Sequence, residues 1–192
     1  MKKPWSWAAA VVVLLGGLFV GSAQAENRAG TWNLSPLIGG YLFEGNQNLK
    51  DRPVFGLGLG YNLTENWGVE GTFTYTSSRA EHGTDRDQVK VSTGRIDALY
   101  HFLPGEMIVP YAALGGGIIS LDQHSNLSKK RGDQDLVADY GAGVKIFFNP
   151  DWALRFDLRH ILDFNVRDEH KSHEFYNNLS VLAGLTWQFG GK

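Results

Sequence analysis

The thirteen residues "WALRFDLRHILDF", from Trp152 to Phe164, alternate between large apolar side chains and charged ones. Arg155, Asp157 and Arg159 occupy three consecutive odd positions, and every even position except His160 is apolar. Because successive side chains of a β-strand point to opposite faces, this period of two predicts a strand with one apolar and one charged face. Which of these faces meets bulk water decides between a soluble secreted protein and a membrane protein.

Seven further segments alternate in the same way, and together they predict an all-β protein with eight strands. The clearest covers residues 54–63, where Leu57, Leu59 and Tyr61 alternate with glycines. Residues 109–121 are nearly all small or apolar, so the facing of that segment stays open. The other predicted strands are residues 31–43, 67–77, a segment ending with 94–102, 136–148 and 178–189.

The connections between these segments are short and long in strict alternation. The short ones, "TEN" (64–66), "LPGEMI" (103–108) and "NPD" (149–151), have the composition of tight turns. The long ones are charged and cover residues 44–53, 79–88, 122–135 and 165–176. An up-and-down meander with short turns at one end and long loops at the other is typical of an outer-membrane barrel.

The first residues predict a secretory signal peptide over residues 1–25, followed by a barrel domain over residues 26–192. Lys2 and Lys3 precede an apolar run over residues 8–20, and Ala23 and Ala25 form an Ala-x-Ala cleavage pattern. The run is shorter than the roughly 20 residues that span a bilayer as a helix, which favours a cleaved leader over a membrane anchor.

Charge and cysteine content exclude several classes of site. The chain has a formal charge of −2, and removal of Lys2 and Lys3 with the leader leaves −4. A net acidic chain gives no indication of a nucleic-acid partner, which usually requires a basic face. The absence of cysteine excludes disulfides and thiolate metal sites. We therefore expect no metal and no cofactor, and a fold held by its core or its backbone ladder.

The alternation alone fits two architectures. A soluble barrel of the lipocalin or streptavidin type would bury the apolar face, whereas a membrane barrel would turn it to lipid. The polar face is rich in glycine, serine and threonine, which suit the crowded lumen of a narrow barrel. Large aromatics of the apolar face stand beside the short turns and predict an aromatic girdle, made of Trp67, Phe102, Phe148, Trp152, Trp187 and Phe189.

These features favour an eight-stranded antiparallel up-and-down transmembrane β-barrel, which places the charges of the opening stretch in the lumen. Ionisable groups taken out of bulk water require partners, so we predict a network of salt bridges that fills the barrel and blocks continuous water flow. Its predicted members are three acids and four bases: Glu70, Arg95, Asp97, Lys145, Arg155, Asp157 and Arg159.

The segments "YNLTENWGVEGTFTY" (61–75), "RIDALYHFLPGEMIVPYAALGGG" (95–117), "FFNPDWALRFDLRHILDFN" (147–165) and "NNLSVLAGLTWQFGGK" (177–192) carry a resemblance. They resemble the OmpA-like outer-membrane β-barrel domain over almost the whole mature chain. The resemblance implies a monomeric or weakly associated barrel in the outer membrane of a Gram-negative cell, in contact with outer-membrane lipid and lipopolysaccharide. We expect export by the general secretory route and a monomer. The resemblance also implies insertion by the barrel-assembly machinery, which reads a final aromatic residue; Phe189 matches, although "GGK" follows it. Only the barrel domain is matched, so no peptidoglycan-binding domain is expected.

Function is less determined than fold, because this architecture hosts unrelated activities. We expect a structural or surface role without catalysis, with the long loops extracellular. A lipid A-modifying enzyme is an alternative, since "HSN" (124–126) superficially resembles part of a Ser-His-acid arrangement, but the spacing fixes no acid beside it. A narrow small-solute conduit is another, although eight strands leave a filled interior. "HKSH" (170–173) has a metal-like spacing without a third ligand.

Overall fold

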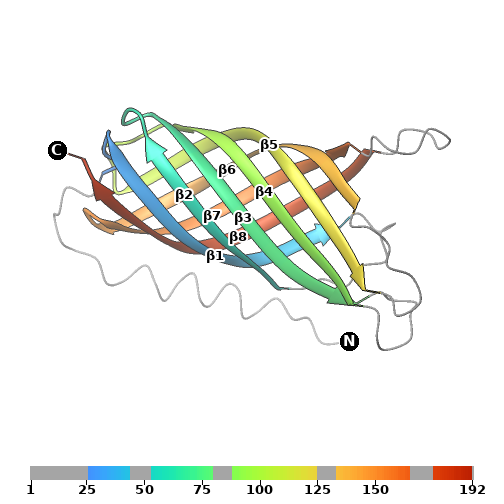
Figure 1. Cartoon of the computed structure of the whole chain (residues 1–192). Coiled ribbons are helices and arrows are strands. Elements are labelled where there is room, and N and C mark those ends of the chain that lie inside the picture. Colours follow the sequence, from blue (N-terminus) through green and yellow to red (C-terminus); the bar gives the residue numbers. More distant parts are fainter. Residues whose placement is uncertain (1–25, 44–52, 80–87, 125–132, 165–174, 192) are drawn as a thin grey trace, which may run out of the picture.

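The computed structural model describes residues 26–43, 53–79, 88–124, 133–164 and 175–191, and these form a closed antiparallel barrel of eight strands (Figure 1). Each strand pairs with its neighbours in sequence, and β8 closes the barrel on β1. No helix in this part of the chain is long and apolar enough to cross a membrane. The strands are β1 Thr31–Phe43, β2 Pro53–Asn62, β3 Trp67–Arg79, β4 Gln88–His101, β5 Ile108–His124, β6 Asp133–Asn149, β7 Trp152–Phe164 and β8 Phe175–Gly190.

The predicted fold class and topology are confirmed, and two predicted strands, residues 31–43 and 152–164, have the bounds that the sequence indicates. Several others extend further at the end away from the short turns. The β5–β6 ladder still pairs Leu121 with Asp133, although the charged sequence there predicts a loop. The ladder requires only backbone groups, so it continues past the end of the apolar alternation. The predicted long loops consist largely of residues outside the described part, namely 44–52, 80–87, 125–132 and 165–174.

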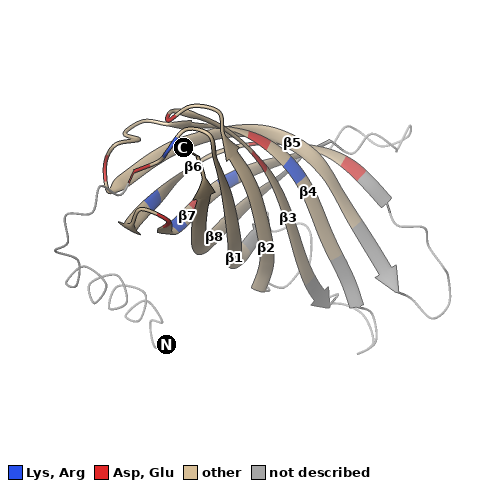
Figure 2. Ribbon diagram, turned by 60° about the vertical axis from the view of Figure 1, so that its left-hand side comes forward, with Lys and Arg blue, Asp and Glu red and all other residues tan. Residues whose placement is uncertain are grey.

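Side chains alternate between the two faces of the barrel wall as a period of two requires. Leu57, Phe73 and Ile96 are exposed on the outside, whereas Glu70 and Arg155 are buried inside. The apolar face therefore lies outward and the polar face inward. The blue and red bands in Figure 2 mark the basic and acidic positions along the strands. A closed ladder of this kind also leaves no unpaired sheet edge.

The facing of β5, open in the sequence, is settled by the structure. Tyr111, Ala113 and Ile119 are buried in the lumen, while Leu114 and Ile118 are exposed on the outer wall. Glycines between the inward side chains provide room for larger neighbours. A Cβ added at Gly143 would collide with the Tyr111 ring, so this position must stay small for that tyrosine to reach the centre.

The lumen is not polar throughout, which corrects the expectation of a charge network that fills the barrel. Along β7, the inward residues after Arg155 and Asp157 are Arg159 and then Ile161. Ile161 belongs to a contiguous buried cluster beyond the charges, which we call the apolar layer: Leu37, Val54, Val91, Ile119, Val137, Ile161 and Leu182. Seven of the eight strands each contribute one of these residues, so the layer lies across the lumen.

Candidate functional site: the barrel interior

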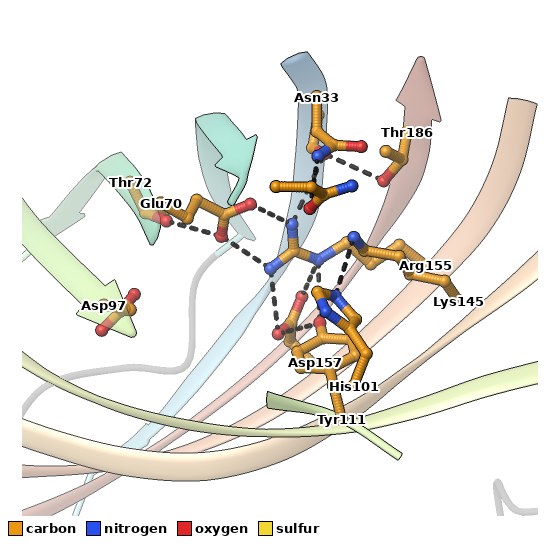
Figure 3. Close-up of polar contacts among 12 residues, drawn as sticks. Asn33, Glu70, Thr72, Asp97, His101, Tyr111, Lys145, Arg155, Asp157 and Thr186 are labelled. Carbon is orange, nitrogen blue, oxygen red and sulfur yellow. Dashed lines mark hydrogen bonds and ion pairs between the residues drawn. The ribbon is translucent and has the colours of Figure 1, made fainter. Parts of the chain in front are cut away.

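Arg155 is the centre of the charges inside the barrel and is 1% exposed. Its guanidinium donates to both carboxylate oxygens of Glu70, which reaches across from β3, with Nη2 lying 2.7 Å from Oε1. Its Nε donates to Oδ2 of Asp157 at 2.6 Å, two residues further along β7 (Figure 3). A guanidinium presents parallel donors that match a carboxylate, so this pairing is both directional and strong.

Tyr111 of β5 links the same groups from a third side. Its hydroxyl donates to Oδ1 of Asp157 and accepts from Nε of Arg155 at 2.9 Å. Thr72 adds a donor to Oε1 of Glu70 at 3.2 Å. We call Glu70, Tyr111, Arg155 and Asp157 the central cluster. Glu70 accepts hydrogen bonds from β7 on the opposite side of the barrel and from Thr72 of its own strand, and Asp157 accepts them from β5 and from its own strand.

A second group, the outer cluster, lies between the central cluster and the apolar layer and consists of Arg95, Asp97, Asp139 and Arg159. The ion pairs within it are longer: 3.4 Å from Arg95 Nη1 to Asp139 Oδ2, and 3.9 Å from Arg159 Nη1 to Asp97 Oδ2. Arg159 also joins the two clusters, because its Nη2 lies 3.1 Å from Oδ1 of Asp157. Within the described residues, neither oxygen of Asp97 accepts a hydrogen bond. Figure 3 shows Asp97 standing apart from the dashed contacts of the central cluster.

Lys145 lies on the other side of Arg155, toward the short turns, and is fully buried. Its ammonium is 3.1 Å from Nε2 of His101 and 3.4 Å from Oδ1 of Asn27, and it lies 5.9 Å from the centroid of the Tyr111 ring. No carboxylate of the described residues forms an ion pair with it. Lys145 is therefore a buried cation held by neutral partners.

All seven charged residues predicted for the lumen are buried inside the barrel. The prediction left out Asp139, which has the inward parity of its strand and could have been found from that alternation. With it, the buried charges of the described strands comprise four acids and four bases instead of three and four. Tyr111 was also missed, because the apolar run of β5 gives no indication of its facing.

The six aromatics predicted as a girdle lie at strand ends beside the short turns. Trp67, Phe102 and Trp187 are exposed on the outer wall, and the other three are half-buried. Trp152 stacks on Trp187 with ring centroids 5.9 Å apart, and Trp187 lies 4.6 Å from Phe189. These contacts make a continuous aromatic surface over β7 and β8.

The weaker catalytic and metal patterns fall largely outside the described residues. His124 is the last residue of β5, while Ser125, Asn126, His170 and His173 lie outside the described residues. Within the described ranges, no three histidines or carboxylates are grouped so that they could hold a metal ion.

The family described as "Outer membrane protein beta-barrel domain" matches residues 10–189. The chain belongs to this family. Its OmpA-like resemblance is thereby confirmed, and the protein is an outer-membrane β-barrel protein.

The curated relative that matches is outer membrane porin F of Pseudomonas aeruginosa, 26% identical over 183 residues that cover 93% of this chain. The chain spans about half of that protein's length, 51%.

Solved structures show the same fold. The N-terminal β-barrel domain of Pseudomonas aeruginosa OprF is 18% identical with a TM-score of 0.57, covering 84% of this chain and 98% of that one. Neisserial surface protein A is 12% identical with a TM-score of 0.67, covering 83% and 99%. Ail, the attachment invasion locus protein of Yersinia pestis, is 16% identical with a TM-score of 0.58, covering 84% and 99%. At these identities the likeness concerns the fold alone.

Proposed function

We propose that this protein is a structural, surface-exposed component of the Gram-negative outer membrane, with a lumen closed by its own side chains. The observation that carries the proposal is the position of Arg155, whose guanidinium reaches across the lumen to Glu70 of β3 and is also bound by Asp157 of its own strand. Moving Arg155 aside would leave the buried carboxylate of Glu70 without its cation and would remove one of the two cations paired with Asp157, which is energetically costly.

The apolar layer adds a second barrier in series with the charges. A hydrated ion crossing it would lose hydration without gaining polar partners, and hydrophobic constrictions in channels close by dewetting for that reason. The polar and apolar barriers thus oppose passage by different physical means.

The surface role is supported by the relatives and by the loops. Neisserial surface protein A and Ail carry surface and attachment roles in their names, and both have this fold. We extend such a role to the long charged connections of this chain, which we place on the extracellular side. The expected partners are outer-membrane lipid and lipopolysaccharide, and the barrel-assembly machinery acting on the final strand at Phe189. We expect export by the general secretory route and a monomer.

Catalysis is not part of this proposal. Comparing lipid A acyl-chain number in cells with and without the protein tests the point. An unchanged number supports a non-enzymatic role, and the loss of one chain on expression would contradict it.

A narrow conduit is the second candidate, and the outer cluster favours it. Its ion pairs of 3.4–3.9 Å are looser than those around Arg155, and the matching curated relative is named a porin. Planar-bilayer recording of the mature protein separates the two functions. We expect no sustained conductance, whereas a large and stable conductance would show that the lumen is open.

A further inference from the structure

The structure points to a lid at the end of the barrel with the short turns. We propose that residues 26–30, before β1, form a lid that closes the periplasmic mouth of the lumen. Asn27 holds this lid in place, and release of the lid exposes Lys145 to the periplasm. This inference rests on the proposed function in one respect: removing the lid changes access to the lumen only if the lumen beyond it is closed.

The lid is joined to all three short turns and to the end of β8. The backbone amide of Asn27 donates to the carbonyl of Pro104 at 2.8 Å, and its side-chain amide donates to the carbonyl of Glu65 at 2.7 Å. Arg28 forms an ion pair with Asp151 at 2.7 Å. The side-chain amide of Gln188 donates to the carbonyl of Glu26 at 3.1 Å. Each strand connection at this end is thus attached to the same five residues.

Asn27 anchors the lid, because its side chain faces into the lumen and is 1% exposed. Its side-chain oxygen accepts from the Asn62 amide at 3.1 Å and from the Lys145 ammonium at 3.4 Å. Asn62 also donates to the carbonyl of Arg28 at 3.0 Å. A buried polar side chain bonded on every side costs free energy to displace, which gives the closed position its stability.

The same oxygen gives the lid an electrostatic role. Lys145 has no carboxylate partner among the described residues, and the Asn27 oxygen is one of the two polar groups that contact its ammonium. Removal of the lid would leave this cation at the mouth of the compartment. An opened mouth should therefore attract anions over cations.

The natural absence of cysteine makes a direct test possible. Thr186→Cys places a reporter thiol in the lumen beside Ser35, at a side chain that is fully buried. Labelling by small methanethiosulfonates, one anionic and one cationic, is followed in the folded mature protein in phosphatidylcholine vesicles. Folding is verified by heat-modifiable gel mobility.

We expect slow labelling with the native lid and labelling about tenfold faster or more in N27A/R28A, which loses several hydrogen bonds of the lid. The matched control is A29S, at an exposed lid residue. The anionic reagent should react faster than the cationic one in N27A/R28A, and adding K145M should remove that preference. If N27A/R28A does not fold, R28A alone is measured, with a smaller rise expected.

Unchanged labelling in a folded lid variant, or fast labelling with the native lid, would overturn the inference. A second reporter, Thr93→Cys beyond the central cluster, separates this inference from the proposed closed lumen. Its thiol should stay unlabelled in every lid variant. Labelling of Thr93→Cys with the native lid would contradict the closed lumen and not the lid.

Discussion

The central and outer clusters contain the same kinds of side chain within one lumen, yet they are built differently. In the central cluster the Arg155 guanidinium lies 2.5–2.7 Å from both oxygens of Glu70 and from Oδ2 of Asp157, and it pairs with Glu70 through two parallel bonds. The ion pairs within the outer cluster are 3.4–3.9 Å long, and Asp97 accepts no hydrogen bond from the described residues. The shortest ion pair of Arg159, at 3.1 Å, is with Asp157 of the central cluster. Equal charge therefore does not mean equal stabilisation, because hydrogen-bond geometry decides how much of the desolvation cost is recovered.

The largest loss of unfolding free energy is expected from Arg155→Leu. The substitution removes the cation that pairs with Glu70 and one of the two cations that pair with Asp157, and it leaves the Glu70 carboxylate buried without an ion pair among the described residues. This should cost about 3–5 kcal/mol of unfolding free energy. Heat-induced gel mobility and urea unfolding in lipid vesicles measure the loss. An unchanged melting profile would show that Arg155 is not held in a buried network.

A double-mutant cycle sharpens the comparison between the clusters. Replacing Glu70 and Arg155 by leucine, singly and together, should give a coupling energy of about 2–3 kcal/mol, because contacting charged residues couple strongly. The same cycle on Asp97 and Arg159 should give less than about 1 kcal/mol, given their 3.9 Å separation. Equal coupling in both cycles would show that the two clusters are paired equally well.

Much of the fold could be predicted from the sequence, because the alternation of β7 and the regular turn lengths act locally. The parity of each strand also placed Glu70 and Arg155 inside. Their pairing could not be predicted, since these residues are 85 positions apart and meet only through the stagger with which the barrel closes.

Other features lacked a periodic pattern to reveal them. Asn27 precedes the first alternating segment, so nothing in the sequence marked it as a buried residue. Part of the apolar layer was hidden because residues such as Val137 and Leu182 lie in runs where both faces are apolar or small. A period of two distinguishes a polar face from an apolar face only where the two faces differ in chemistry.

A milder effect is expected from Asp97→Asn in the outer cluster. The substitution removes a charge whose ion pair with Arg159 is long, and it keeps the side-chain shape. We expect a loss of about 1 kcal/mol or less, well below that of Arg155→Leu. Urea unfolding under the same conditions provides the measurement, and a loss as large as that of Arg155→Leu would show that the outer cluster is equally well formed.

The smallest changes in unfolding free energy are expected from substitutions of two buried threonines, one in each half of the lumen. Thr72 donates to Glu70 at 3.2 Å, whereas the hydroxyl of Thr93, near the outer cluster, has no hydrogen-bond partner among the described residues. Valine has nearly the shape of threonine without the hydroxyl, so Thr72→Val should lose about 1 kcal/mol and leave a carboxylate oxygen short of one donor. Thr93→Val should be neutral or slightly stabilising, because it removes a buried polar group that gains nothing from the fold. Urea unfolding of the two variants side by side tests the difference, and a reversed order would mean that hydrogen bonding does not distinguish the two halves of the lumen.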